Sequence, residues 1–180
     1  MKRKRLSKGK SIRPTFFVFC EGESEEAYVK YLRSQYRLPI EICPSIAGLN
    51  INQDFINKFK RNKSVDPKDR DYLMYDLDRE DILKRLLTIK GATIIASNPC
   101  LEIWYLLHYA AQKGEITSSR CLSLLKKHLP GYKKGEVSGE LQSVMTLNRD
   151  IALSRAKSLK TRANPSTDIP LFLEDLENAK

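Results

Sequence analysis

The sequence predicts an α/β fold in which a mostly parallel sheet of about four strands is flanked by helices. The strands are predicted from four short apolar segments, at residues 15–20, 40–43, 71–75 and 92–96. Helical patterns lie between these segments, as the crossovers of a parallel sheet require, at residues 24–36, 51–62 and 79–90. The length of 180 residues suits one domain with a substantial core and is short for two.

Local start and stop signals delimit these elements. Gly22 permits a sharp turn after the first strand, and Ser24 can cap the helix that follows. Pro44 is predicted to bound the second strand, because proline cannot donate a hydrogen bond to a sheet. Gly91 closes the helix that precedes the fourth strand.

A helical region is predicted after the sheet. Pro99 lies near the first turn of a helix at residues 100–112. Beyond Gly114 the chain becomes more polar, and further helices are predicted at residues 118–128, 138–147, 148–160 and 170–178. We therefore divide the chain into a basic disordered arm at residues 1–14 and a single domain at 15–180, with an α/β core at 15–112 and a helical extension at 113–180.

The formal net charge of +10 is unevenly distributed. The first 13 residues carry seven basic side chains and no acid, which leaves a net charge of +3 for the rest. A basic arm of this kind indicates a polyanionic partner, usually nucleic acid, and its contacts would include Lys2, Arg3, Lys4 and Arg5. The alternative is a tail that only aids solubility. Lys133 and Lys134, in a loop between helices, could also bind a phosphate or could be solvated loop charges.

Nothing in the sequence predicts a membrane segment or an export signal. The longest apolar runs are far shorter than the eighteen or so residues that a membrane span requires, and no apolar segment of signal-peptide length follows the basic arm. Four scattered cysteines form no CxxC pair and are expected to be reduced thiols, chiefly buried: Cys20, Cys43, Cys100 and Cys121. We expect a cytoplasmic protein without a membrane partner.

Two acidic turns follow predicted strands. Glu21 and Glu25 come after the first strand, and Asp76 and Asp78 come after the third. Ligands of a parallel sheet bind at the carboxyl ends of its strands, so both turns are expected at the functional edge. Clustered carboxylates favour a hard cation, Mg²⁺ or Mn²⁺, which can activate water for attack on a phosphodiester. Alternatively, Glu25 only caps a helix and Asp78 is only an N-cap.

These turns resemble the Toprim domain of topoisomerases, primases and OLD-family nucleases. Most of the chain, from Thr15 to about Leu176, more narrowly resembles the RloB family, of which the most specific string is Ser97-Asn98-Pro99-Cys100-Leu101-Glu102-x-Trp104-x-Leu106-Leu107-His108. The family is bacterial and associated with restriction–modification and phage-defence loci. The resemblance implies a Toprim-like, Mg²⁺-dependent nuclease.

The resemblance also implies roles for individual acids. Glu21 would be a general acid/base or a metal ligand, and Asp76 and Asp78 would hold the metal. Glu25 and Glu102 would be further ligands or would position water. The neighbouring acids leave open which of Glu23, Glu25 and Glu26 faces the site.

Glu102 and His108 belong to one predicted helix, but we expect different positions and roles for them. Glu102 stands in its first turn, beside the end of the fourth strand, and is expected at the site. His108 is a candidate catalytic residue that could donate to a phosphate or position a water. Because six residues separate the two, they are offset by about 120° around an ideal helix. The alternative for His108 is a partly buried side chain bonded to a backbone carbonyl.

Two functions are compatible with the sequence. The first is a Mg²⁺- or Mn²⁺-dependent nuclease that cleaves RNA or DNA in anti-phage defence by abortive infection. The second is a non-catalytic nucleic-acid-binding or sensing subunit of a defence or restriction–modification system. The substrate, the trigger, a partner protein and self-association are left open by the sequence.

Overall fold

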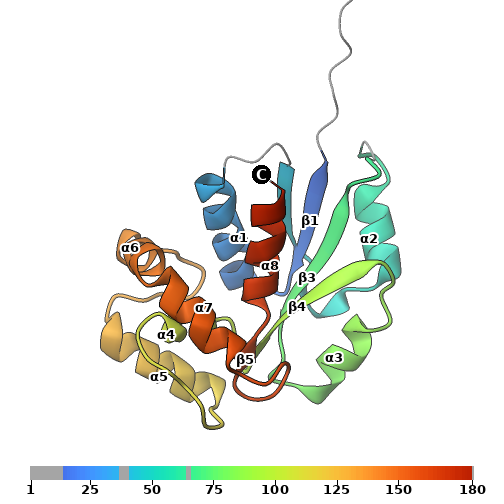
Figure 1. Ribbon diagram of the computed structural model, residues 1–180. Helices are drawn as coiled ribbons and strands as arrows, with labels where there is room; N and C mark the ends of the chain where they lie inside the picture. The colour runs from blue at the N-terminus through green and yellow to red at the C-terminus, as the bar shows by residue number, and fades with distance from the viewer. Residues whose placement is uncertain (1–13, 37–40, 64–65, 180) are drawn as a thin grey trace, which may run out of the picture.

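A five-stranded sheet with helices on both faces forms the centre of the protein (Figure 1). The computed structural model describes residues 14–36, 41–63 and 66–179. The strand order is β2-β1-β3-β4-β5. The parallel strands are β1 (Thr15–Cys20), β2 (Glu41–Ile46), β3 (Arg70–Asp76) and β4 (Ala92–Asn98), and β5 (Ser166–Thr167) runs antiparallel to β4. The predicted α/β class and the mostly parallel sheet are therefore confirmed.

The direction of the chain across the sheet reverses between β1 and β3. Helix α1 (Glu23–Gln35) leads from β1 to the edge strand β2, and α2 (Gln53–Lys60) leads back past β1 to β3. Helix α3 (Glu80–Leu86) continues in that direction to β4. Right-handed crossovers in opposite directions place their helices on opposite faces, so α1 covers one face while α2 and α3 cover the other (Figure 1). The carboxyl ends of β1 and β3 form the topological switch point.

Alternate side chains of β1 enter two separate cores. Val18 packs on the face of α1, together with Trp104 and Phe172. Phe17 and Phe19 pack on the opposite face with residues of α2 and α3. Because both faces of a parallel strand are buried, β1 appears in the sequence as a continuous apolar run.

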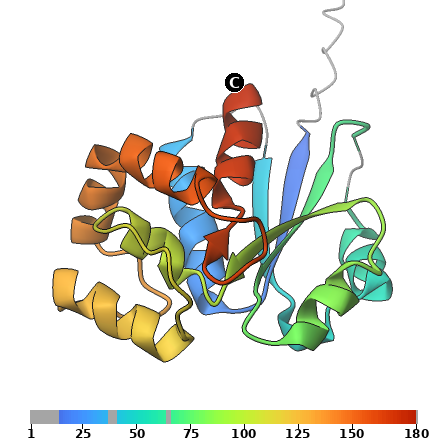
Figure 2. The same cartoon turned by 60° about the horizontal axis from the view of Figure 1, so that its bottom comes forward.

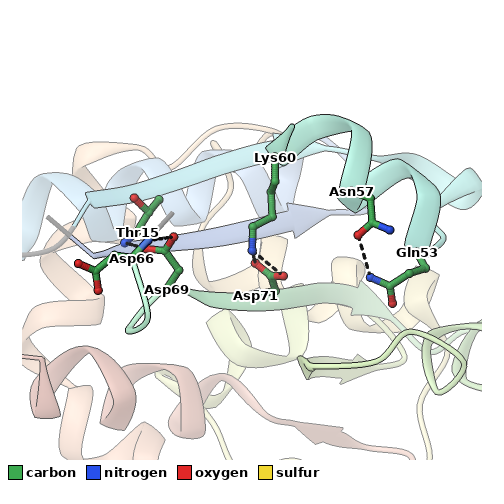
Figure 3. Close-up of polar contacts among 7 residues, drawn as sticks. All are labelled: Thr15, Gln53, Asn57, Lys60, Asp66, Asp69 and Asp71. Carbon is green, nitrogen blue, oxygen red and sulfur yellow. Dashed lines mark hydrogen bonds and ion pairs between the residues drawn. The ribbon is translucent and has the colours of Figure 1, made fainter. Parts of the chain in front are cut away.

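Polar contacts close the amino end of the sheet (Figure 3). The Thr15 amide donates to Asp69 Oδ1 at 2.6 Å, and Lys60 Nζ reaches the two carboxylate oxygens of Asp71 at 2.8 and 3.0 Å. These aspartates are thus paired structural groups at the end of the sheet opposite the switch point.

After β4 the described chain forms the helices α4 (Glu102–Leu107), α5 (Ser118–His128), α6 (Gly139–Leu147), α7 (Arg149–Lys157) and α8 (Ile169–Asn178). Helices α5, α6 and α7 extend the structure beside the sheet (Figure 2). Helix α8 covers the sheet on the side of α1 (Figure 1). No helix in the described ranges has the length and apolar character needed to cross a bilayer.

Several details of the predicted elements are wrong, including the N-cap of α1, which is Gly22 and not Ser24. Strand β2 continues past Pro44 to Ile46, because at the sheet edge a proline need not donate to a neighbour. Helix α4 ends at Leu107 instead of residue 112. Side chains from α7 and its N-cap satisfy the last carbonyls of α4: Arg155 Nη1 donates to Leu107 O at 2.6 Å and Asn148 Nδ2 donates to His108 O at 3.0 Å. The fifth strand, two residues long, was not predicted.

Asn52 is the N-cap of α2, and its Oδ1 accepts a hydrogen bond from the Phe55 amide at 2.8 Å. We expect Asn52→Ala to lower the free energy of unfolding by about 1 kcal/mol, because that amide loses its acceptor. Urea denaturation followed by circular dichroism measures the change. Asn57→Ala, an exposed site within the same helix, is the control and should leave stability unchanged or slightly raised. Equal losses in both variants would contradict the capping role.

Candidate functional site

The switch point joins the predicted acids Glu21 and Asp76. Glu21 directly follows β1, and its amide donates to the Met74 carbonyl of β3 at 3.1 Å. Its side chain then turns along the sheet edge, where Oε2 accepts a hydrogen bond from the Asp76 amide at 3.1 Å. Two acids that are 55 positions apart in the sequence are thereby held together at the ends of neighbouring strands.

Asp76 connects this edge to helix α4. Its Oδ1 accepts a hydrogen bond from the Leu101 amide at 2.8 Å, and Leu101 is the N-cap of α4. Glu102 follows in the first turn of that helix and is only 1% exposed. The structure therefore brings Glu102 to the side of the sheet edge where the sequence predicted it.

Glu25 is the member of the acidic run that faces inward. It lies in the first turn of α1, is 5% exposed, and its Oε2 accepts a hydrogen bond from the Gly22 amide at 2.9 Å. Glu23 is exposed, and Glu26 pairs with Lys30 at 2.7 Å on the same helix. Glu25 thus caps α1 and is also buried, where the charges of Glu21 and Glu102 act on it, so whether it only caps the helix stays open.

Burial, with mutual repulsion, raises the pKa values of three of these carboxyls, those of Asp76, Glu25 and Glu21. Burial raises the pKa of Asp76 well above its ordinary value of 3.8, and the charges of Glu25, Glu102 and Glu21 add to the effect. Burial likewise raises the pKa of Glu25, with Glu21 and Glu102 contributing. The pKa of Glu21 is raised by burial and by Asp78, which is itself exposed. The ionised forms of these three carboxyls are therefore less favourable at this edge than in water.

The loop between α5 and α6 covers Glu102. Tyr132, which is buried, donates its hydroxyl to Glu102 Oε1 at 2.9 Å, and Lys134 Nζ lies 3.6 Å from the same oxygen. The Gly135 amide donates to Ser24 Oγ at the start of α1 at 3.2 Å. Gly135 has a φ of +75°, a conformation that favours glycine. This loop is therefore docked on the same edge, against both α1 and α4.

Of the two predicted loop lysines, the structure brings only Lys134 to the carboxylates. Burial by itself lowers the pKa of Lys134, but Glu102 and the other nearby acids outweigh it and raise the pKa, so the side chain stays an ammonium at neutral pH. Lys133 is exposed. Lys2, Arg3, Lys4 and Arg5 of the predicted nucleic-acid contact lie outside the described residues.

Tyr132 is the site residue that the sequence did not reveal. An aromatic residue in a polar loop, between Gly131 and two lysines, was the available signal. Such a residue generally anchors its loop against the domain, but the pattern does not say against which group.

His108 is not brought together with the acids. It lies at the C-terminal end of α4, whereas Glu102 lies at the N-terminal end. Its side chain is 2% exposed, and its Nδ1 is 2.9 Å from the Trp104 carbonyl. Burial lowers the pKa of His108 to about 4, so the ring is neutral at pH 7. This arrangement matches the alternative of a buried histidine bonded to a backbone carbonyl.

The oxygen donors at this edge are chemically suited to Mg²⁺ or Mn²⁺. Within the described residues, no three His, Cys, Asp or Glu side chains are grouped so that they could hold an ion among them. Mg²⁺ usually keeps several waters and binds through one or two carboxylates together with substrate phosphates, so a closed cage is not required. Glu21 and Asp76 fit that mode. The predicted set of Glu21, Asp76 and Asp78 stays a prediction.

Asp76 has a pKa raised in the folded state, so the folded protein binds its proton more tightly than the unfolded chain does. As the pH rises through the range above the ordinary value of 3.8, this group costs the folded state stability. We expect Asp76→Asn, which keeps an oxygen for the Leu101 amide, to be more stable than the wild type at pH 7.

The stability advantage of Asp76→Asn should shrink as the pH falls toward 4, because the wild-type carboxyl is then protonated. Urea denaturation at several pH values measures it. Asp71→Asn, which breaks the ion pair with Lys60 at the other end of the sheet, serves as the control and should gain no stability at pH 7. If the wild type were more stable than Asp76→Asn, and increasingly so as the pH rises, the result would contradict the raised pKa of Asp76.

A comparison with models of protein families places the chain in one family. Residues 16–176 match the model of the family described as RloB-like protein. A search of curated proteins and a search of solved structures each found no match. The matched residues include both acidic turns, α4 and the loop that covers Glu102. The chain belongs to the RloB-like protein family.

Proposed function

We propose that this protein is a metal-dependent nuclease of Toprim type that hydrolyses phosphodiester bonds of RNA or DNA in bacterial anti-phage defence. One observation carries the proposal. A hydrogen-bonded series from Glu21 through Asp76 to Leu101 connects β1, β3 and α4 at the topological switch point, where Glu25 and Glu102 are also buried. The membership of the RloB-like family and the fold are compatible with it.

The cost of this arrangement argues for a catalytic role. Several carboxyl groups stand partly desolvated at one edge, and their raised pKa values mean that the ionised forms are unfavourable there. A surface that only bound phosphate would gain nothing from such acids, since both are negative. Grouped carboxyls with shifted pKa values are frequent at catalytic sites.

Each side chain would have a distinct task in the proposed hydrolysis. When bound, Mg²⁺ would polarise the phosphate and lower the pKa of a water. Asp76, held by the Leu101 amide, would orient the ion. Glu21 would hold or release a proton, since its pKa is raised in the direction of neutral pH. Lys134 would neutralise a phosphate oxygen, and Tyr132 would fix the position of Glu102.

The contact between Lys134 and Glu102 favours one second candidate. An ammonium 3.6 Å from Glu102 Oε1 already offsets part of the charge that a metal would offset. The protein could then be a non-catalytic nucleic-acid-binding or sensing subunit of a defence system, which a partner protein would complete. Failure of the purified protein to cleave with any divalent metal would favour this candidate.

Substitution of the two central acids tests the nuclease. We expect Glu21→Gln and Asp76→Asn each to lower the rate of cleavage by at least about 100-fold, since each removes a carboxylate while keeping its size and one hydrogen bond. The measurement is Mg²⁺- or Mn²⁺-dependent degradation of a mixed panel of RNA and DNA. Glu115→Gln, in an exposed loop, is the control and should cleave as the wild type does. Equal cleavage by all four proteins would mean that these acids are not catalytic.

The basic arm generates a separate expectation for binding. Removing one lysine or arginine that neutralises a phosphate should lower the slope of log K against log salt concentration by about 0.9 on duplex DNA and about 0.7 on single strands. A chain that lacks residues 1–13 should therefore bind nucleic acid more weakly and with a smaller slope. Fluorescence anisotropy at several salt concentrations measures both. An unchanged slope would mean that the arm only aids solubility.

A further inference from the structure

Helix α5 and the loop that follows it form a basic surface without acids. Residues 116–135 contain no aspartate or glutamate and carry five lysine or arginine side chains. All five are exposed, and we call them the α5 basic surface: Arg120, Lys126, Lys127, Lys133 and Lys134. Helix α5 lies at the outside of the molecule (Figure 1).

The apolar face of α5 is already covered by protein. Cys121 is buried in a cluster with residues of α4, and Leu125 is buried in the main core. The opposite face carries Arg120 and Lys127, which are seven residues apart. Seven residues make about two helical turns, so these two side chains lie on one side of the helix, about 10 Å apart along its axis. Ser123, between them, is also exposed, so the face that α5 turns to the solvent is cationic and polar.

Most of these cations have no acidic partner. Lys134 Nζ lies 3.6 Å from Glu102 Oε1. Within the described ranges, no ion pair with a carboxylate involves any of the other four. Lys60, by contrast, is matched by Asp71 at the amino end of the sheet. Exposed cations that are gathered on one surface and lack acidic partners attract a polyanion.

The α5 basic surface continues to the acidic edge of the sheet. After α5 the chain turns, and the Tyr132 amide donates to the Leu129 carbonyl at 3.0 Å. The Tyr132 hydroxyl then bonds Glu102, and the Lys134 ammonium stands beside the same oxygen. A polyanion that follows α5 toward its C-terminal end would therefore arrive at the carboxyls of the switch point.

We propose that the α5 basic surface binds the sugar–phosphate backbone of a nucleic acid and leads it to the carboxyls at the switch point. Arg120, Lys126 and Lys127 are the contacts that this adds to the two loop lysines. What happens to the nucleic acid at the carboxyls rests on the proposed nuclease, whereas the backbone contacts require neither a metal nor cleavage. The same surface would therefore serve a non-catalytic subunit as well.

The composition of the surface indicates binding that does not depend on base sequence. Lysine and arginine neutralise phosphates, and such contacts carry no sequence information. Tyr132 is the one Phe, Tyr or Trp side chain of residues 116–135, and it is buried. An exposed ring on which a base could stack is thus lacking in this segment.

A membrane with anionic lipids is the other common polyanion, and it suits this surface less well. A helix that binds in a membrane interface buries an apolar face among the lipids. The apolar face of α5 is instead covered by protein. Of the described residues, the large apolar side chains that are exposed all lie outside α5 and its loop.

Binding of labelled nucleic acid to the full chain, with a chelator present to prevent cleavage, tests the proposal. The probes are an RNA single strand, a DNA single strand and a DNA duplex of mixed sequence, and fluorescence anisotropy is measured at several salt concentrations. The double variant Lys126→Gln and Lys127→Gln should bind at least about fivefold more weakly. The slope of log K against log salt concentration should fall in magnitude by about 1.4 on single strands and about 1.8 on the duplex, because two phosphate contacts are lost. Arg120→Gln should lower it by about half as much.

The control removes the same charge from the other face of the sheet. The double variant Lys58→Gln and Arg61→Gln replaces two exposed cations of α2 and its C-cap, and it should bind as the wild type does. Glutamine is nearly as good a helix former as lysine or arginine, so the helices should be retained. Circular dichroism checks that each variant is folded.

Three results would overturn the proposal. Equal losses in the two double variants would mean that net charge, and not the α5 basic surface, governs binding. An unchanged salt slope in the α5 double variant would exclude phosphate contacts there, as would a wild type that binds none of the probes at low salt. Vesicles with anionic lipid whose binding is lost in the α5 double variant, while binding of nucleic acid is unchanged, would identify a membrane contact instead.

These outcomes are distinguishable from failure of the proposed nuclease. A wild type that binds nucleic acid through α5 but cleaves none with any divalent metal would retain the binding surface and remove the nuclease. Metal-dependent cleavage together with binding that the α5 variants leave unchanged would retain the nuclease and remove the binding surface.

Discussion

The hydrogen bond from the Asp76 amide to Glu21 Oε2 couples the ends of the two central strands at the point where the strand order reverses. Asp76 in turn accepts from the Leu101 amide, which sets the start of α4 and thereby the position of Glu102. Tyr132 then bonds Glu102 and holds the loop after α5 against the same edge. Four segments that are remote in the sequence are thus positioned by one short series of hydrogen bonds.

The same series has an electrostatic cost that its own donors do not remove. Backbone amides stabilise the ionised forms of Glu21, Glu25 and Asp76, yet burial and mutual repulsion still raise their pKa values. The Lys134 side chain, which is itself exposed, pairs its ammonium with the buried Glu102. By contrast, Asp71 at the amino end of the sheet is matched by Lys60. Asp71 at one end of the sheet is thus paired, whereas the acids at the other end are crowded and have raised pKa values.

The sequence predicted those features of the fold that depend on residues close together in the chain. The alternation of buried strands and amphipathic helices follows from short-range periodicity, and parallel strands place Glu21 and Asp76 at the same edge of the sheet. Their contact also requires that β1 and β3 are neighbours. The parts that it missed depend on distant partners. Tyr132 bonds a residue 30 positions away, and the early end of α4 is set by Asn148, 40 positions from His108. Strand β5 has only two residues and exists because it pairs with β4.

His108 shows how helix geometry divides one sequence motif between two places. It belongs to the same string as Glu102, but the two lie at opposite ends of the short α4. Glu102 therefore reaches the sheet edge, and His108 reaches a cavity lined by Tyr28 and Tyr31 of α1. Helix α1 is divided in the same way, with Glu25 in its first turn and Tyr31 farther along. Between the two places lies the bond from Trp104 Nε1 to the Tyr28 hydroxyl, which joins α4 to α1. Because Trp104 and Tyr28 are buried and bonded to each other, the packing of α1 against α4 links the position of Glu25 with that of Glu102.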